Sequence, residues 1–264
     1  MIGRDSDIST HVHPTAILSP DAQLGENVSI GPYSVISDDV QLGDNTFIGN
    51  HVTVAEGTIV GESCRIFHSS SIGEIPQDLK FGGEKTKTII GNNTTIREYV
   101  TINKGTIAHG KTEVGSNVLI MAYVHIGHDS IVGNNVIFAN QVTLGGHVEV
   151  DDWVSLGGGV LVHQFCKIGT HAFVGAGYTV LQDVPPYILA AGNPLRFAGI
   201  NKIGLKRRGF SSETRQQIKK TYRTYFRSDV NRSEAIKLIE MNSSQSNEIN
   251  QLLLFIKNSN RGII

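Results

Sequence analysis

The chain has 264 residues, a net charge of −1 and only two cysteines, Cys64 and Cys166. A charge so close to zero argues against binding of nucleic acid through a global field, and two cysteines provide neither a disulfide framework nor metal-ligand spacing. Residues 1–14 lack the basic and apolar regions of a signal peptide, and no apolar run approaches the length of a membrane span. We therefore expect a cytoplasmic protein of one or two domains without an integral membrane segment.

An aliphatic residue, or once a phenylalanine, recurs at every sixth position. The series starts at Val12, stops after Ile72, resumes at Ile90, slips at Ala108 and ends at Val180. A helix needs apolar spacings of three and four and a simple strand needs two, so a period of six predicts a short strand followed by a corner. Glycine often follows the aliphatic residue, and we interpret it as the residue that lets the backbone turn at positive φ.

Hexapeptide repeats are a sequence signature of parallel β-helices. The run resembles the hexapeptide-repeat acyltransferases, and this resemblance implies a left-handed coil of three hexapeptides, or 18 residues. Coils stack at roughly 4.8 Å, so residues 12–180 would form about nine of them. The fold class is thus mainly β, with residues 1–190 expected to form a left-handed parallel β-helix and residues 191–264 a C-terminal α-helical region.

The repeat is interrupted twice. The first interruption is a loop insertion near residues 74–88, EIPQDLKFGGEKTKT, which we expect to replace one coil. Such loops often lie on the binding face of a solenoid. The second interruption covers residues 103–112. The DVPPY segment at 183–187 is expected to end the β-helix, because proline lacks the N–H that a strand ladder needs.

From Ser211 onward the pattern becomes helical. The segment SSETRQQIKKTYRTYFR has Ser211 and Ser212 as N-cap candidates and apolar residues at helical spacing. Two further helices are predicted in SEAIKLIEM, with Ser233 as its cap, and in NEINQLLLFIKN. The region is too small for a core of its own, so it should pack on the β-helix or on another subunit.

The segment 196–227 contains ten basic residues and one acid, Glu213. This excess predicts an anionic partner such as a phosphate or an acidic protein, with a solvated helix face as the alternative. The consecutive residues Lys206, Arg207 and Arg208 lie beside glycines and favour a phosphate contact.

After the second interruption the repeats run from Val114 to Val180. With 18-residue coils, polar residues of this part of the chain meet at one corner of three successive coils. Asp129 would lie beneath His147, and Gly146 would leave space between His128 and Gln164. Histidine titrates near neutral pH and suits a general base, and a neighbouring carboxylate orients its ring. We therefore predict His128 as a general base and Asp129 as its partner.

A bare backbone N–H at Gly145 or Gly146 would stabilise a developing oxyanion. Hydrogen bonds to a polar, sugar-like substrate are expected from His125, His147, His163 and Gln164. No serine or cysteine nucleophile stands out by motif, which favours direct attack by a substrate hydroxyl over a covalent intermediate.

Three other interpretations remain for these residues. The histidines would be ordinary polar groups at a solenoid corner, or the whole chain would be a scaffold without an active site. Alternatively His125, His128 and His147 would bind zinc, as in the carbonic anhydrases built on the same type of helix. The zinc spacing of that family is not evident here, so we predict no metal.

Six motifs have a more specific family resemblance: IGEIPQDLK (72–80), HIGHD (125–129), LGGHV (144–148), VHQFCKIG (162–169), QDVPPY (182–187) and GLKRRGF (204–210). They resemble the UDP-N-acetylglucosamine O-acyltransferases, the first enzymes of lipid A synthesis, and the resemblance spans nearly the whole chain. The resemblance implies a homotrimer with active sites between neighbouring prisms. Its members move a 3-hydroxyacyl chain from acyl carrier protein to the 3-hydroxyl of UDP-N-acetylglucosamine.

The resemblance also implies residue roles. His128 would be the base with Asp129 as partner, and the Gly146 amide would face the thioester oxygen. The substrate-binding residues would be Gln77, Asp78, Lys80, His125, His147, His163, Gln164, Asn201, Arg207 and Arg208. The acyl group arrives on the phosphopantetheine of acyl carrier protein, so no other cofactor is implied. Because acyl carrier protein is acidic, the basic segment would help to dock it.

Two positions depart from the family pattern. Ala176 occupies the position of a glycine that admits a long acyl chain, so its methyl group should shorten the preferred chain. Ile203 stands where a carboxylate often contacts the nucleotide. An alternative substrate is therefore a 3-amino sugar nucleotide, which would give an amide. A related N-acyltransferase of the same pathway is a weaker alternative, because it usually has an additional N-terminal domain and this repeat starts by Val12.

Overall fold

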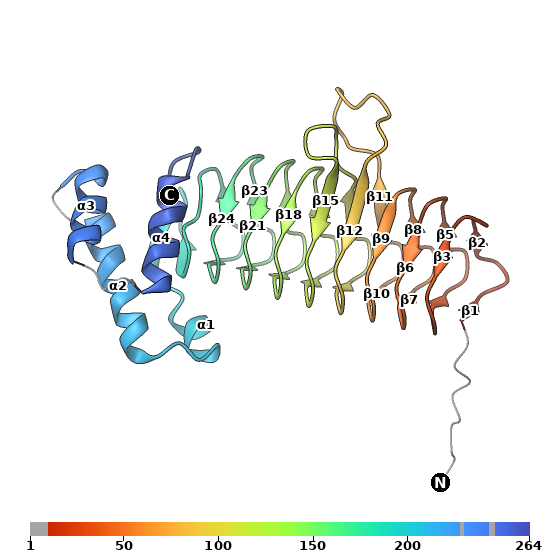
Figure 1. The fold of residues 1–264 in the computed structure, drawn as a ribbon, viewed down its shortest axis with the longest axis horizontal. Coiled ribbons are helices and arrows are strands. Elements are labelled where there is room, and N and C mark those ends of the chain that lie inside the picture. Colours follow the sequence, from red (N-terminus) through yellow and green to blue (C-terminus); the bar gives the residue numbers. More distant parts are fainter. Residues whose placement is uncertain (1–9, 228–229, 243–245) are drawn as a thin grey trace, which may run out of the picture.

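The computed structural model describes residues 10–227, 230–242 and 246–264, so residues 1–9, on which part of the signal-peptide expectation rests, lie outside the described residues. The chain forms a long prism whose faces are three sheets, and four helices lie at its C-terminal end (Figure 1). This is the predicted left-handed parallel β-helix with a C-terminal helical region.

The strands, most of them two residues long, belong to three sheets. Sheet 1 contains β1 (His11–Val12), β4 (Ser29–Ile30), β7 (Phe47–Ile48), β10 (Arg65–Ile66), β13 (Thr95–Ile96), β16 (Leu119–Ile120), β19 (Ile137–Phe138), β22 (Ser155–Leu156), β25 (Phe173–Val174), β27 (Ile188–Ala191) and β28 (Arg196–Ile200). Sheet 2 contains β2 (Ile17–Leu18), β5 (Val35–Ile36), β8 (Thr53–Val54), β11 (Ser71–Glu74), β14 (Thr101–Asn103), β17 (His125–Ile126), β20 (Thr143–Leu144), β23 (Leu161–Val162) and β26 (Thr179–Val180). Sheet 3 contains β3 (Gln23–Leu24), β6 (Gln41–Leu42), β9 (Thr58–Val60), β12 (Lys87–Ile90), β15 (Lys111–Val114), β18 (Ile131–Val132), β21 (Glu149–Val150) and β24 (Lys167–Ile168).

Each coil passes once through each sheet and turns at three corners. In the coil that begins at β16, these corners are residues 121–124, 127–130 and 133–136. We call them corner 1/2, corner 2/3 and corner 3/1 and use the same names for equivalent residues of other coils. The register confirms an 18-residue coil here, since His125 pairs with Thr143 and Thr143 with Leu161.

The sixth-position residues from Ile30 to Val180 are all buried inside the prism. A second interior position, four residues further along each hexapeptide, was not predicted. It holds valine in many coils and a cysteine in two, so Cys64 and Cys166 are buried free thiols of the core.

The interpretation of the repeat glycines holds at Gly73, with φ 82°, but is wrong for most of the others. Gly115 and Gly127 do not have positive φ; the left-handed conformation falls two residues later, as at Asp129 with φ 58°. A Cβ on Gly115 would lie 2.6 Å from the carbonyl oxygen of Gly133 in the next coil. These glycines are therefore required by the close approach of successive coils.

The two interruptions of the repeat are both insertions at corner 2/3. Ser71 pairs with Thr101, 30 positions on, and Thr101 pairs with His125, 24 positions on, where a regular coil would need 18. The strands on both sides stay in register, so the first loop is added to a coil and does not replace one. Figure 1 shows both loops projecting from the same side of the prism.

The C-terminal region contains α1 (Lys202–Arg207), α2 (Ser212–Arg227), α3 (Arg232–Asn242) and α4 (Asn247–Lys257). Helix α1 was not predicted. The Ser211 hydroxyl accepts a hydrogen bond from Thr214 N at the start of α2, as expected, whereas α3 is capped by Asn231 and not by Ser233. None of the described helices combines the length and the apolar character that a membrane crossing requires.

The helices pack against the last coil, one of the two predicted arrangements. The hydroxyl of the buried Tyr222 on α2 donates to the carbonyl of Pro186, at 2.6 Å. After α4, the Ser259 hydroxyl donates to the buried carboxylate of Asp183, at 2.6 Å. Strand β28 pairs antiparallel with β27 and lies at the edge of sheet 1, next to α2.

Candidate active site

The predicted columns of polar residues form at corner 2/3. The His147 N–H donates to the carbonyl of His128 at 2.9 Å, and the Phe165 N–H donates to that of Gly146 at 3.1 Å. His128, Gly146 and Gln164 thus follow one another in successive coils, and Asp129 lies next to His147. The stacking of coils alone brings these residues together.

Asp129 is fully buried and receives hydrogen bonds from three residues. Its Oδ2 accepts from His128 Nδ1 at 2.8 Å and from the Thr106 hydroxyl at 2.7 Å. Its Oδ1 accepts from the backbone N–H groups of Thr106, at 2.8 Å, and His109, at 3.3 Å. Burial raises the pKa of this carboxyl, but the hydrogen bonds from His128 and Thr106 outweigh it and hold the pKa below its ordinary value. Asp129 is therefore ionised at neutral pH.

The ring of His128 is largely buried and lies against Gly146. With Nδ1 directed at the ionised Asp129, the proton of the neutral imidazole belongs on Nδ1 and the lone pair on Nε2. A Cβ added to Gly146 would lie 2.6 Å from this Nε2. Glycine therefore keeps the basic nitrogen accessible, and within the described residues the Gly146 N–H has no hydrogen-bond partner.

His147 packs among aromatic rings beside this pair. It stacks on Phe165 with a centroid distance of 4.5 Å and meets the rings of His128 and His109 edge to face. Its Nε2 lies 3.7 Å from Asp129 Oδ2. Burial lowers the pKa of His147, and the attraction of Asp129 opposes this only in part. The ring is thus a neutral hydrogen-bonding group at pH 7.

His125, His163 and Gln164 border the same corner. His125 Nδ1 is 2.8 Å from the Thr101 hydroxyl, and burial, followed by the nearby His128, lowers its pKa. His163 is exposed, with Nδ1 3.2 Å from Arg261 Nη2 and 3.0 Å from the carbonyl of Gln164. Arg261, near the C-terminus, was not predicted to approach this corner.

The first inserted loop carries Gln77, Asp78 and Lys80, of which Asp78 is near enough for its charge to act on His147. The Asn103 amide, at the end of β14, donates to the carbonyl of Ile75 at 2.9 Å, which ties this loop to the strand before the second insertion. Gln77 and Lys80 are exposed, whereas Asp78 is partly buried and its charge is one of the smaller effects that oppose the lowering of the His147 pKa by burial. The substrate-binding roles of Gln77, Asp78 and Lys80 stay predictions.

Other predicted site residues lie at different corners of the same chain. Ala176 is exposed at corner 1/2. Asn201 and Arg208 flank α1 beside corner 3/1: Asn201 donates to the carbonyl of His171 at 2.9 Å, and Arg208 Nη1 lies 3.4 Å from His171 Nδ1. Arg207 is exposed at the end of α1. A single chain does not bring these residues to His128.

Asn201 is also the N-cap of α1, where its Oδ1 accepts from Gly204 N at 3.1 Å. Arg208 lies over the Trp153 ring, 5.1 Å from its centroid. Burial lowers the pKa of the Arg208 guanidinium, and an arginine side chain remains protonated in proteins. Ile203, one of the two departures from the family pattern, is exposed on α1. Arg208, which we predict to contact the nucleotide, is therefore a cation that lies over the ring of Trp153.

A metal site must also be considered. Ligand-type atoms of His128, Asp129 and His147 lie within 4.8 Å of one another. The zinc interpretation needs His125 in place of Asp129. His125 is not part of this group, and its Nδ1 lies against the Thr101 hydroxyl. The Asp129 oxygens already accept four hydrogen bonds, so the donor set fits a hydrogen-bonded network better than a metal centre.

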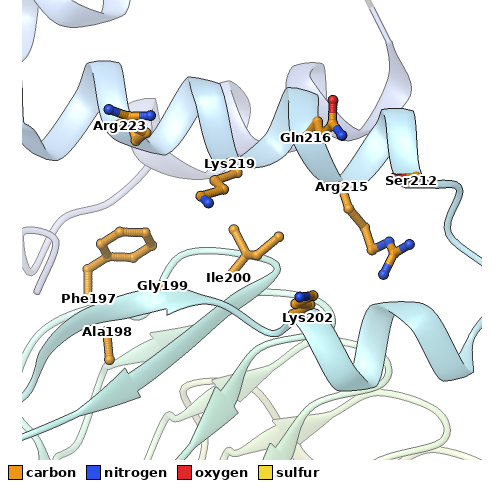
Figure 2. A pocket seen from close by; sticks show the side chains of 10 residues that line it. All are labelled: Phe197, Ala198, Gly199, Ile200, Lys202, Ser212, Arg215, Gln216, Lys219 and Arg223. Carbon is orange, nitrogen blue, oxygen red and sulfur yellow. The ribbon is translucent and has the colours of Figure 1, made fainter.

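A basic groove lies between β28 and α2, with a volume of about 640 Å³ (Figure 2). Phe197 and Ile200 of β28 provide an apolar surface, and none of the ten residues that line the groove is acidic. The basic side chains that line it are Lys202, Arg215, Lys219 and Arg223. The structure thus places four of the ten basic residues of segment 196–227 around one depression.

Sequence reasoning missed three site residues: Thr106, His109 and Phe165. Thr106 and His109 belong to the second insertion, which the sequence identifies only as an irregularity. Phe165 is 18 positions after His147, so the spacing of the coils was sufficient to find it, but an aromatic stack on His147 was not predicted.

Comparisons with known proteins agree with this architecture. A family model described as Udp N-acetylglucosamine O-acyltransferase, domain 2, matches residues 183–264, and one for bacterial transferase hexapeptide repeats matches residues 21–56 and 111–146. Acyl-[acyl-carrier-protein]–UDP-N-acetylglucosamine O-acyltransferase of Myxococcus xanthus is 48% identical and that of a Sulfurihydrogenibium species 56% identical. Each alignment covers 96% of this chain, and 98% and 93% of the respective relative.

Solved structures give the same result. UDP-N-acetylglucosamine acyltransferase of Bacteroides fragilis superposes with a TM-score of 0.94 at 43% identity, covering 96% of this chain and 99% of that one. The enzyme of Francisella novicida superposes with a TM-score of 0.93 at 39% identity, covering 96% and 93%.

His171 provides a test of the geometry around Arg208. Burial, followed by the charge of Arg208, lowers the pKa of His171 to about 4. Since the ordinary value is 6.5, the stability that His171 contributes is lost as pH falls from about 6.5 to about 4. We predict that Arg208→Leu raises this pKa, measured by NMR titration of the histidine ring protons. Arg207→Leu, which removes an exposed charge, is the control and should leave it unchanged; an unaltered titration in Arg208→Leu would contradict the contact.

Proposed function

Because this chain belongs to the UDP-N-acetylglucosamine O-acyltransferase family, we propose that it moves a 3-hydroxyacyl chain from acyl carrier protein to the 3-hydroxyl of UDP-N-acetylglucosamine, the first step of lipid A synthesis. The observation that carries the residue assignment is the 2.8 Å contact between His128 Nδ1 and the buried Asp129, with Nε2 left accessible at Gly146.

In the proposed reaction the sugar hydroxyl attacks the thioester carbonyl while His128 Nε2 takes its proton. Asp129 stabilises the imidazolium that forms. The Gly146 N–H stabilises the oxyanion of the tetrahedral intermediate. As the intermediate collapses, the C–S bond breaks and the imidazolium returns the proton to the thiolate of phosphopantetheine. The products are the 3-O-acyl sugar nucleotide and the free carrier thiol, so the reaction uses no further cofactor and no metal.

The remaining site residues are proposed to bind substrates. Gln77, Asp78 and Lys80 on the first insertion border the corner, together with His125, His147, His163 and Gln164. Asn201, Arg207 and Arg208 would hold the nucleotide, and the exposed Ala176 would limit the acyl chain. We also propose a cytoplasmic location, which agrees with the two buried free cysteines.

A mass-spectrometric transfer assay tests this proposal. UDP-N-acetylglucosamine and its 3-amino analogue are offered with 3-hydroxyacyl carrier proteins of graded chain length. We expect the O-acylated product, and the best chain length reports what Ala176 admits. Product from the amino analogue alone would change the substrate but keep the fold and mechanism.

The same assay tests the base. We predict that His128→Ala lowers kcat by about 10²- to 10⁴-fold, the usual contribution of a general base. The variant must keep the oligomeric state and circular dichroism spectrum of the wild type. Wild-type turnover in this variant would remove His128 from the mechanism.

We propose that the assembly is a homotrimer, because the expected contacts lie at three different corners of one chain. His128 lies at corner 2/3 and Ala176 lies at corner 1/2. Trp153, the ring over which Arg208 lies, is at corner 3/1. A site that contains all three needs residues from neighbouring copies.

Mixed assemblies test this arrangement. His128→Ala and Arg208→Ala, each impaired alone, are produced together and purified as one complex through two different tags. We expect the mixture to regain activity, because some sites then combine an intact His128 with an intact Arg208. Activity no higher than that of the separate variants would mean that each site belongs to one chain. Size-exclusion chromatography with light scattering gives the number of copies.

The basic groove between β28 and α2 is the proposed docking surface for the acidic acyl carrier protein. Its apolar floor and four basic side chains suit an acidic amphipathic surface, and charge complementarity increases association rates. The anionic partner predicted for the whole basic segment 196–227 is thereby assigned to the residues that line this groove.

Two adjacent lysines of α2 provide a matched comparison. Lys219 lines the groove, whereas Lys220 is also exposed and does not line it. We predict that Lys219→Glu raises KM for acyl carrier protein about five-fold, equivalent to roughly 1 kcal/mol, without a comparable change in KM for the sugar nucleotide. Lys220→Glu carries the same charge change and should have a smaller effect. Equal effects of the two variants would place docking elsewhere.

A further inference from the structure

The second insertion, which spans residues 104–110, is held firmly against the prism beside Asp129. Lys104 is buried, and its ammonium group donates to the carbonyl of Glu56 at 2.8 Å. The Thr86 hydroxyl donates to the carbonyl of Gly105 at 2.6 Å. These contacts fix the backbone immediately before Thr106, so the position of Thr106 is set by the fold.

Thr106 contacts both oxygens of the Asp129 carboxylate. Its backbone N–H donates to Oδ1 at 2.8 Å and its hydroxyl donates to Oδ2 at 2.7 Å. The same hydroxyl oxygen accepts from the N–H of Ala108 at 3.2 Å, which directs the hydroxyl proton toward the carboxylate. Two donors from one residue hold the carboxylate plane against rotation.

The orientation of this plane decides what His128 can do. Oδ2 is the atom that accepts from His128 Nδ1. Rotation of the carboxylate would move Oδ2 away from the imidazole, and the ring would lose the partner that fixes its tautomer and its direction toward Gly146. The neighbouring N–H of His109 reaches only Oδ1, at 3.3 Å, so it does not replace the hydroxyl.

We propose that Thr106 is a positioning residue for the transfer reaction, which holds Asp129 in the orientation that keeps His128 aimed at the substrate. The inserted loop is then part of the catalytic apparatus, although none of its residues needs to touch the reacting atoms. This inference rests on the proposed roles of His128 and Asp129.

Thr106→Val tests it, because valine keeps the shape and the backbone N–H and removes only the hydroxyl. We expect kcat to fall about 10- to 100-fold, the size typical of partners that orient a functional histidine, with KM for the sugar nucleotide unchanged. Thr106→Ser restores the hydroxyl and should recover most of kcat. Wild-type kcat in Thr106→Val, or no recovery in Thr106→Ser, would overturn the proposal.

Thr94→Val is the matched control. Thr94 is also fully buried at a corner, where its hydroxyl donates to the carbonyl of Gly115 at 2.9 Å and accepts from Val118 N at 3.3 Å. It lies at corner 3/1, away from His128. We expect its kcat to equal that of the wild type. A loss equal to that of Thr106→Val would show that any buried hydroxyl has this effect and would contradict a specific role.

A spectroscopic measurement separates this inference from the proposed function. The Nδ1 proton shared by His128 and Asp129 should give a downfield proton resonance in the wild type and in Thr106→Ser. His128→Ala assigns this resonance by its absence. We expect Thr106→Val to lose or broaden the signal.

A persistent signal in Thr106→Val would overturn the positioning role even if kcat fell. If the wild type transferred no acyl group, the proposed function would fail, while the resonance would still decide whether Thr106 orients the pair.

Discussion

The structure depends on the close stacking of successive coils. Strands of two residues cannot hold a register alone, but each corner touches the next coil so closely that glycine is required where backbones approach, as at Gly115 and Gly127. Buried aliphatic residues at every sixth position fix which side of each strand faces inward. Side chains 18 residues apart are consequently held next to one another. This is why a histidine, a glycine and a glutamine from three coils follow each other along one edge of the prism.

The two insertions add what regular coils lack. At regular corners the position equivalent to Asp129 is solvent-accessible, as at Asn117 and Tyr123, and a carboxylate there would be a weakly oriented surface group. The second insertion covers Asp129 completely and replaces water by donors from Thr106 and His109. A buried charge is unfavourable unless it is hydrogen-bonded, and here the donors also keep the pKa of the carboxyl low. An oriented carboxylate that is ionised at neutral pH, beside a histidine, is the arrangement that the proposed base requires.

The distribution of the other site residues connects the fold to assembly. A rigid prism has three edges that point in different directions, so no movement of the coils can bring Ala176 or Arg208 to His128 within one chain. Arg208, which follows α1, is held against the prism by His171 and Trp153, and the helical region also presents the basic groove beside α2. In the proposed trimer, separate elements of neighbouring copies would each supply part of the site: base, nucleotide contact and acyl-chain limit.

The sequence by itself determined the period, the buried faces and the columns of corner 2/3, because a repeat of fixed length translates directly into spatial neighbours. The amino-acid pattern was therefore sufficient to group His128, Asp129, Gly146 and His147, and the family motifs supplied their expected roles. The reason for most of the repeat glycines was predicted wrongly, since the approach of neighbouring coils is a contact between residues distant in sequence. The paths of the inserted loops were also decided only by tertiary structure. Non-repetitive segments have no period to place them, and the contacts of Thr106 with Asp129 arise from packing across 23 positions of the chain.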